Sequence, residues 1–196
     1  MSSKRPIQYI IPVLTFMAIL LSCTRNYTPK PKGFIRIEPP VAQYVVFDEA
    51  GQPYSFSFSR QAIIELPQAD SNMYLLNIDY PDFKAKIYCS YIAITPRTVN
   101  HYIEDCYKLA GRVARNTDAI NEKYYENKEN NMYGTLFVID GESASPVQFM
   151  LTDSVKHFFR GALYYKYKTE ADSIAPVTDF IKNDIIELIQ TFHWKK

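Results

Sequence analysis

The stretch KIYCSYIAITPRTVNHYIEDCYKLAGRVAR, residues 86–115, changes its apolar spacing partway along. In residues 86–94 the apolar positions alternate from Ile87 to Ala93, as in a half-buried β-strand. After Pro96 they return at steps of three and four residues, which indicates an amphipathic helix. This stretch therefore predicts a strand followed by a long helix that ends in the polar residues 126–131. The apolar stripe of the predicted helix comprises Val99, Tyr102, Ile103, Cys106, Leu109, Ala110, Val113, Ile120 and Tyr124.

Further strands are predicted on both sides of this helix. The order of strands, long helix, three strands and closing helix predicts an α+β fold: a largely antiparallel sheet with a long mid-chain helix and a C-terminal helix packed on it. The closing helix is expected to start with Ser173 as its N-cap and to hold Pro176 in its first turn. The order also resembles the Mog1/PsbP-type sandwich, an analogy of fold that says little about function. The other predicted strands are residues 44–47, 54–58, 73–80, 133–139, 146–151 and 157–167.

The N-terminus has the features of an export signal. Two basic residues, Lys4 and Arg5, precede an uncharged, largely apolar run over residues 6–21. The run is shorter than the roughly 20 residues of a membrane span, so it favours a secretory signal over an uncleaved anchor. The sequence Leu-Leu-Ser-Cys at 20–23 resembles the lipobox of bacterial lipoproteins. That resemblance implies removal of residues 1–22 and acylation of Cys23 by palmitate-type chains.

The segment after the cysteine is expected to connect a lipid anchor to one folded domain. Two or more acyl chains give stable membrane attachment. Residues 23–40 contain Pro29, Pro31, Pro39 and Pro40, which predicts an extended tether. Residues 41–196 then form a single α+β domain. Since no acidic cluster follows the cysteine, we expect an outer-membrane lipoprotein that faces the periplasm.

Composition excludes several classes of function. Without Lys4 and Arg5 the 22 basic residues become 20 against 21 acidic ones, a net charge of −1, so no nucleic acid partner is expected. The sequence has no CxxC motif, no His/Cys cluster and no glycine-rich phosphate loop, so neither a metal nor a cofactor is expected. Cys89 and Cys106 could form a disulfide, but two separate buried thiols are favoured. The 16 tyrosines either pack in sheets with their hydroxyls at the rim or line an interface.

The densest polar segment, residues 148–165, holds the candidate partner-contact residues Gln148, Asp153, His157 and Arg160. A Ser154–His157–Asp153 triad is conceivable, but catalytic triads are defined by geometry across a fold and not by proximity in sequence. The G-x-S-x-G motif of serine hydrolases is also absent. The segment therefore favours a contact surface over an enzyme.

Each of these residues also has a purely structural interpretation. Asp153 and Ser154 can cap a turn between two strands. Arg160 can pair with a carboxylate such as that of Asp153, and His157 can be an ordinary residue at the rim. Gly161 can mark a bulge or a close approach of another part of the chain.

Several segments together resemble one family. Residues 141–149, 151–154, 156–164 and 172–177 resemble the gliding-motility lipoprotein family of the GldD type, and so do the lipobox at Cys23, the tether and residues 77–81. The resemblance implies a role in gliding motility and the associated type IX protein secretion, with other envelope proteins as partners. It implies no enzymatic activity and no cofactor, and it supplies one functional residue, Cys23.

Two functional hypotheses follow, with an enzyme ranked below both. The first is a non-enzymatic accessory or assembly lipoprotein that contacts other envelope proteins through residues 148–160 and has no small-molecule substrate. The second is a periplasmic lipoprotein that binds a lipid or small molecule in an apolar cleft between the sheet and the long helix. An enzyme would need a cleft that gathers several groups with strongly shifted pKa values.

Overall fold

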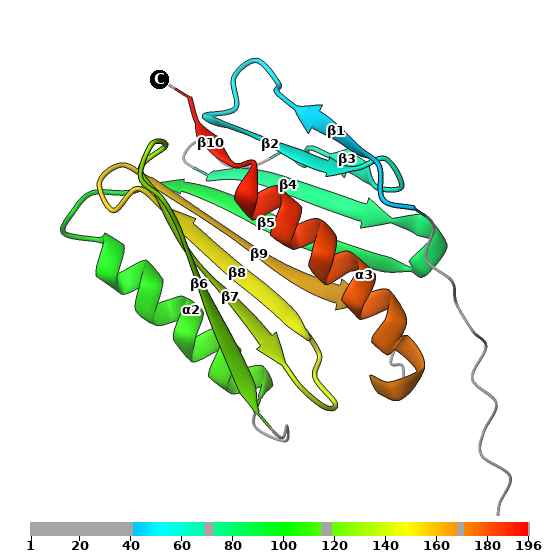
Figure 1. Cartoon of the computed structure of the whole chain (residues 1–196). Helices are drawn as coiled ribbons and strands as arrows, with labels where there is room; N and C mark the ends of the chain where they lie inside the picture. Colours follow the sequence, from blue (N-terminus) through cyan, green and yellow to red (C-terminus); the bar gives the residue numbers. More distant parts are fainter. Residues whose placement is uncertain (1–40, 69–72, 115–118, 168–170, 196) are drawn as a thin grey trace, which may run out of the picture. The chain divides into compact units, whose positions relative to one another are not determined.

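The computed structural model describes residues 41–68, 73–114, 119–167 and 171–195 (Figure 1). The alternation of residues 86–94 produces β5, which lies inside a seven-stranded sheet between β4 and β9. The strands are β1 (Tyr44–Phe47), β2 (Tyr54–Ser59), β3 (Ile63–Glu65), β4 (Met73–Tyr80), β5 (Ala85–Ala93), β6 (Ile120–Asn127), β7 (Met132–Ile139), β8 (Val147–Thr152), β9 (His157–Tyr165) and β10 (His193–Trp194). The helices are α2 (Val99–Val113), α3 (Ala171–Gln190) and the short 3-10 helix η1 (Pro81–Phe83).

The strands form two sheets. The larger sheet has the order β3-β4-β5-β9-β8-β7-β6, and the smaller has the order β1-β2-β10. All pairings between the described strands are antiparallel. With a mid-chain helix and a C-terminal helix, this confirms the predicted α+β class.

The larger sheet has two faces that bury different cores, because side chains alternate along each strand. In β9, Phe159 and Leu163 join the larger core with α3 and the smaller sheet, and we call this side the large-core face. Phe158 joins the smaller core with α2 on the opposite side, the small-core face. Figure 1 shows α3 crossing the strands, while α2 lies by β6, β7 and β8.

The large-core face is packed with aromatic rings. The ring of Phe159 lies 4.8 Å from that of Tyr54 and 5.2 Å from that of Phe192, between ring centroids. These rings come from β9, β2 and the segment after α3, so this cluster holds the two sheets and the helix together. All three side chains are fully buried.

The two cysteines lie on opposite faces. Cys89 belongs to the large core and Cys106 to the small core, and both are free thiols. This confirms the prediction of two separate buried thiols. Beside Cys89, Gly161 is a point of close approach: a Cβ atom there would meet a ring carbon of Phe149 and the sulfur of Cys89.

The long helix is shorter than predicted. It ends at Val113, and residues 120–127 form β6 instead. Ile120 and Tyr124 are four residues apart, a spacing that fits one face of a helix and also one face of a strand. Pairing with β7 along its whole length makes this segment a strand.

The closing helix is longer than predicted. It begins at Ala171, so Ser173 lies inside it and not at its N-cap. Pro176 is also inside the helix, where the packing of Val177 and Ile181 in the large core outweighs the lost hydrogen bond. Strands β3 and β10 were not predicted, because they contain only three and two residues.

Candidate functional site

The turn between β8 and β9 is built around Asp153. Its Oδ1 accepts the backbone N–H groups of residues 155–157 at 2.8 to 2.9 Å. The Thr152 hydroxyl donates to the carbonyl of His157 and accepts the N–H of Ser154, which has a left-handed φ of 64°. Burial disfavours the charged Asp153 carboxylate, but the N–H bonds outweigh it and hold the pKa below its ordinary value. The turn-capping interpretation of Asp153 is confirmed.

His157 is held by aromatic neighbours. Its Nδ1 lies 2.7 Å from the Tyr91 hydroxyl, and its ring stacks on that of Trp194 with 5.0 Å between centroids. Burial lowers the pKa of His157, although Asp153 partly opposes this, so the neutral ring is favoured relative to an exposed histidine. A catalytic triad needs the imidazole between its serine and its aspartate. Here the imidazole is hydrogen-bonded to the Tyr91 hydroxyl, and Asp153 Oδ1 accepts the backbone N–H groups of the turn.

Arg160 and Gln148 lie on the other face of the sheet. The Arg160 Nε donates to the Ser90 hydroxyl at 3.2 Å. Burial raises the pKa of the nearby Cys106 thiol to about 11, even though Arg160 acts to lower it. Gln148 is only 8% exposed.

The four candidate contact residues therefore do not form one surface, which corrects the expectation drawn from the sequence. Positions 157 and 160 are three positions apart in the same strand, an odd spacing, so their side chains point to opposite faces. Arg160 bonds to Ser90 on β5, while Asp153 caps the turn, so the suggested pair between them is replaced by two separate contacts. Because Gln148 is buried, it is not available to a partner.

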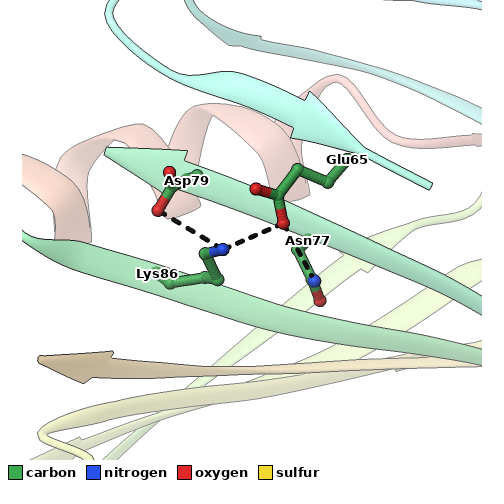
Figure 2. A network of polar contacts seen from close by, with 4 residues as sticks. All are labelled: Glu65, Asn77, Asp79 and Lys86. Carbon is green, nitrogen blue, oxygen red and sulfur yellow. Dashed lines mark hydrogen bonds and ion pairs between the residues drawn. The ribbon is translucent and has the colours of Figure 1, made fainter. Parts of the chain in front are cut away.

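A polar network joins β3, β4 and β5 on the small-core face (Figure 2). The Lys86 Nζ lies 2.9 Å from Glu65 Oε2 and 3.7 Å from Asp79 Oδ1. Asn77 also donates to Glu65 Oε2, at 3.3 Å. The hydrogen bond to Glu65 raises the pKa of Lys86, and the same bond lowers the pKa of Glu65. A lysine of raised pKa stays protonated, so the network is suited to fixing the short β3 and not to nucleophilic chemistry.

A buried carboxylate connects α3 to strands β1 and β4 on the large-core face. Asp184 on α3 accepts hydrogen bonds from the hydroxyls of Tyr44 and Tyr80, at 3.0 and 3.1 Å. Burial raises the pKa of Asp184 above its ordinary value. Burial and the neighbouring Asp184 raise the pKa of Tyr44 to about 12. The arrangement joins β1, β4 and α3 and has a structural role.

The small-core face also contains an open groove, with a volume of about 580 Å³, between α2 and the end of the sheet. We call it the tyrosine groove. Its lining includes Ile103 and Tyr107 from α2, Tyr124 from β6, Tyr133 from β7 and Met150 from β8. It lies where the second hypothesis expected a cleft, but tyrosine and threonine hydroxyls line it together with the apolar groups.

The rings of the tyrosine groove are both exposed and held in place. Tyr124, Tyr133 and Tyr107 are 69%, 40% and 37% exposed. The hydroxyls of Tyr124 and Tyr107 both donate to Glu122 Oε2, at 2.6 and 3.4 Å. Exposed tyrosines are enriched at interfaces. This site was not predicted from the sequence, because the spacing of Tyr124 fits a helix, although the number of tyrosines raises the possibility of an interface.

In the described ranges, no three His, Cys, Asp or Glu side chains gather as a metal site would require. None of the described helices combines the length and apolarity of a membrane-spanning segment. Cys23 and the predicted tether lie outside the described residues.

Comparison with known proteins identifies the family. The chain is similar to the solution structure of cyanobacterial PsbP (CyanoP) from Synechocystis sp. PCC 6803, with 11% identity, a TM-score of 0.49, and coverage of 79% of this chain and 94% of that one. A search of curated proteins found no match. The family described as "Gliding motility lipoprotein GldD" matches residues 24–194, nearly the whole chain after Cys23. The chain therefore belongs to the GldD family of gliding motility lipoproteins, whose members are lipid-anchored in the cell envelope.

Proposed function

We propose that this lipoprotein acts, without enzymatic activity, as an accessory or assembly component of the gliding motility and type IX secretion machinery. The observation that carries the proposal is the family match over residues 24–194. The geometry around Asp153 and His157 supports it, since these groups complete a turn and an aromatic cluster and leave no activated nucleophile there. Its partners are other proteins of that machinery.

The proposal includes a location. The lipid on Cys23 holds the chain at the outer membrane, with the folded domain in the periplasm. The lipobox at residues 20–23 and the absence of an acidic cluster after Cys23 support this placement. Fractionation of inner and outer membranes, combined with protease access in intact cells, measures it; recovery in the inner membrane, or cleavage in intact cells, would contradict it.

A deletion in the source organism tests the function. Surface spreading and the proteins released into the medium are scored together, and the strain is complemented with the wild type or with Cys23→Ala. We expect loss of spreading or secretion that the wild type restores and Cys23→Ala does not. Normal spreading together with a normal set of secreted proteins would overturn the proposal.

A lipid- or small-molecule-binding lipoprotein remains the second candidate, and the tyrosine groove is the observation that favours it. The groove is open to solvent and lined with hydroxyls, whereas an acyl chain calls for an enclosed apolar cavity. Native mass spectrometry of the purified lipoprotein distinguishes the two candidates. A bound small molecule that disappears in Tyr133→Ala would support the second.

A further inference from the structure

Strand β6 presents a free edge. It is the last strand of the larger sheet, and in the described part of the chain it pairs with β7 and with no other strand. It is eight residues long and mostly exposed. Every strand at a sheet edge carries backbone N–H and C=O groups that face away from its neighbour, and these groups can pair with an added strand.

The tyrosine groove lies beside this edge and on one face of it. Glu122, Tyr124 and Glu126 occupy alternate positions of β6, so their side chains point to the small-core face, where Tyr107 of α2 meets Glu122. In a strand added beside β6, every second side chain would stand next to these three residues. The other side chains would point to the opposite face.

The chemistry of the groove favours a cation. Its lining includes Glu126 but no Lys, Arg or His. The ring faces of Tyr124 and Tyr107 attract positive charge, and both hydroxyls donate to the Glu122 carboxylate. Glu126 pairs with Lys128 at 3.7 Å, but both side chains are well exposed. Such a surface pair contributes little, so a partner's cation can replace Lys128.

The basic residue within β6 points elsewhere. Lys123 lies over the ring of Tyr125, 5.1 Å from its centroid, and Tyr125 packs against the large core. The small-core face of β6 is therefore acidic and aromatic, while its lysine belongs to the other face. Because of this separation, the edge should prefer an added strand with positively charged side chains. This preference adds to the backbone hydrogen bonds that any added strand could form.

We propose that the free edge of β6 and the tyrosine groove form one docking surface, which takes an extended segment of a partner protein with Lys or Arg at every second position. The partner adds a strand to β6, and its basic side chains enter the groove against Tyr124, Glu122 and Glu126. This deepens the proposed function, on which it rests for the presence of a protein partner.

Synthetic peptides test the docking surface on the purified full-length lipoprotein in detergent. Two fluorescent probes have the length of β6, one alternating Lys and Thr and the other alternating Glu and Thr. A third repeats the Lys probe with an N-methyl group on every backbone amide, which removes the N–H donors from both edges and so prevents strand pairing. Fluorescence anisotropy is expected to show binding of the first probe at least about tenfold tighter than of the other two.

Protein variants locate the site. Tyr124→Ala is expected to weaken binding of the Lys probe by about tenfold, and Glu122→Gln by a smaller factor. The matched control is Tyr88→Ala, an exposed tyrosine on the same face at β5, which should leave binding unchanged. Circular dichroism confirms that each variant is folded.

Any one of the following outcomes would overturn the proposal: equal binding of the Lys and Glu probes, undiminished binding of the N-methylated probe, or full affinity in Tyr124→Ala. Displacement of the Lys probe by an equal concentration of tetramethylammonium would assign the groove to a small cation and also overturn it. Because binding is measured on purified protein, its failure leaves the deletion phenotype as a separate test of the proposed function.

Discussion

The two faces of the larger sheet use their aromatic residues in different ways. On the large-core face, Phe159, Tyr54 and Phe192 are fully buried beneath α3 and the smaller sheet. On the small-core face, α2 covers a limited core, and tyrosines such as Tyr124 and Tyr88 remain exposed. Buried rings contribute to the free energy of folding, whereas exposed rings contribute little to it and are available to a partner. The large-core face therefore provides most of the stability, whereas the small-core face leaves aromatic rings exposed.

The largest expected effect comes from removing a ring of the large core. Phe159→Ala should lower the free energy of unfolding by about 3–5 kcal/mol, because it deletes a buried ring and leaves a cavity. The comparison is Tyr164→Ala in the same strand, whose exposed ring makes an edge contact with Tyr88 and should cost less than about 1 kcal/mol. Denaturant unfolding measures both. Equal losses would contradict the division between the faces.

A smaller effect is expected from adding a side-chain carbon at Gly161, where Phe149 and Cys89 approach the backbone closely. The Cβ of Gly161→Ala would collide with a ring carbon of Phe149, so the variant should lose about 1–3 kcal/mol through overpacking. In Gly111→Ala the Cβ meets nothing within 4 Å, and this variant should gain about 0.5–1 kcal/mol from helix propensity. Thermal unfolding of the two variants should therefore shift in opposite directions. A stabilised Gly161→Ala would show that the strands can move apart at no cost.

The third prediction concerns pH. Burial raises the pKa of Asp184 in the folded state, so its contribution to stability is complete below its unfolded pKa, near 3.8, and is lost as pH rises through the folded pKa. In Asp184→Asn this part of the pH dependence should disappear. Unfolding free energies measured from pH 3 to pH 7 check it. An identical slope in both proteins would mean that other groups produce the dependence.

The smallest effect is expected for the polar network. Lys86→Met removes the contacts with Glu65 and Asp79 on the small-core face and should cost less than about 1 kcal/mol, because the groups are partly exposed. The loss should shrink further in high salt. Chemical unfolding at low and high salt measures it; a loss comparable to that of Phe159→Ala would make the network part of the stabilising core.

The segments that could be predicted from the sequence are those whose apolar spacing fits a strand or a helix but not both. In residues 86–94 the apolar positions alternate over too long a stretch for a helix, and β5 covers nearly the same residues. The spacing of Ile120 and Tyr124 fits both a helix and a strand. This segment is a strand because it pairs with β7, and a local pattern carries no information about that pairing. Strands β3 and β10 are defined by distant partners and not by their own residues.

The candidate site was less predictable than the fold. The odd spacing of His157 and Arg160 in one strand was a signal that they point to opposite faces, and it was available in the sequence. The tyrosine groove gave no comparable signal, because Tyr107 and Tyr124 meet only when α2 packs beside β6. Sites made by contact between elements depend on the tertiary fold.

The pairing of β2 with β10 has a consequence for the order in which the domain folds. Tyr54 pairs with Trp194, so the smaller sheet joins residues separated by almost the whole length of the domain. That sheet cannot close until residue 194 is available to pair, and the aromatic cluster around Phe192 must wait as well. A chain that becomes available from its N-terminus onward therefore lacks a complete core until its C-terminal strand is present, so the smaller sheet is expected to form late in folding.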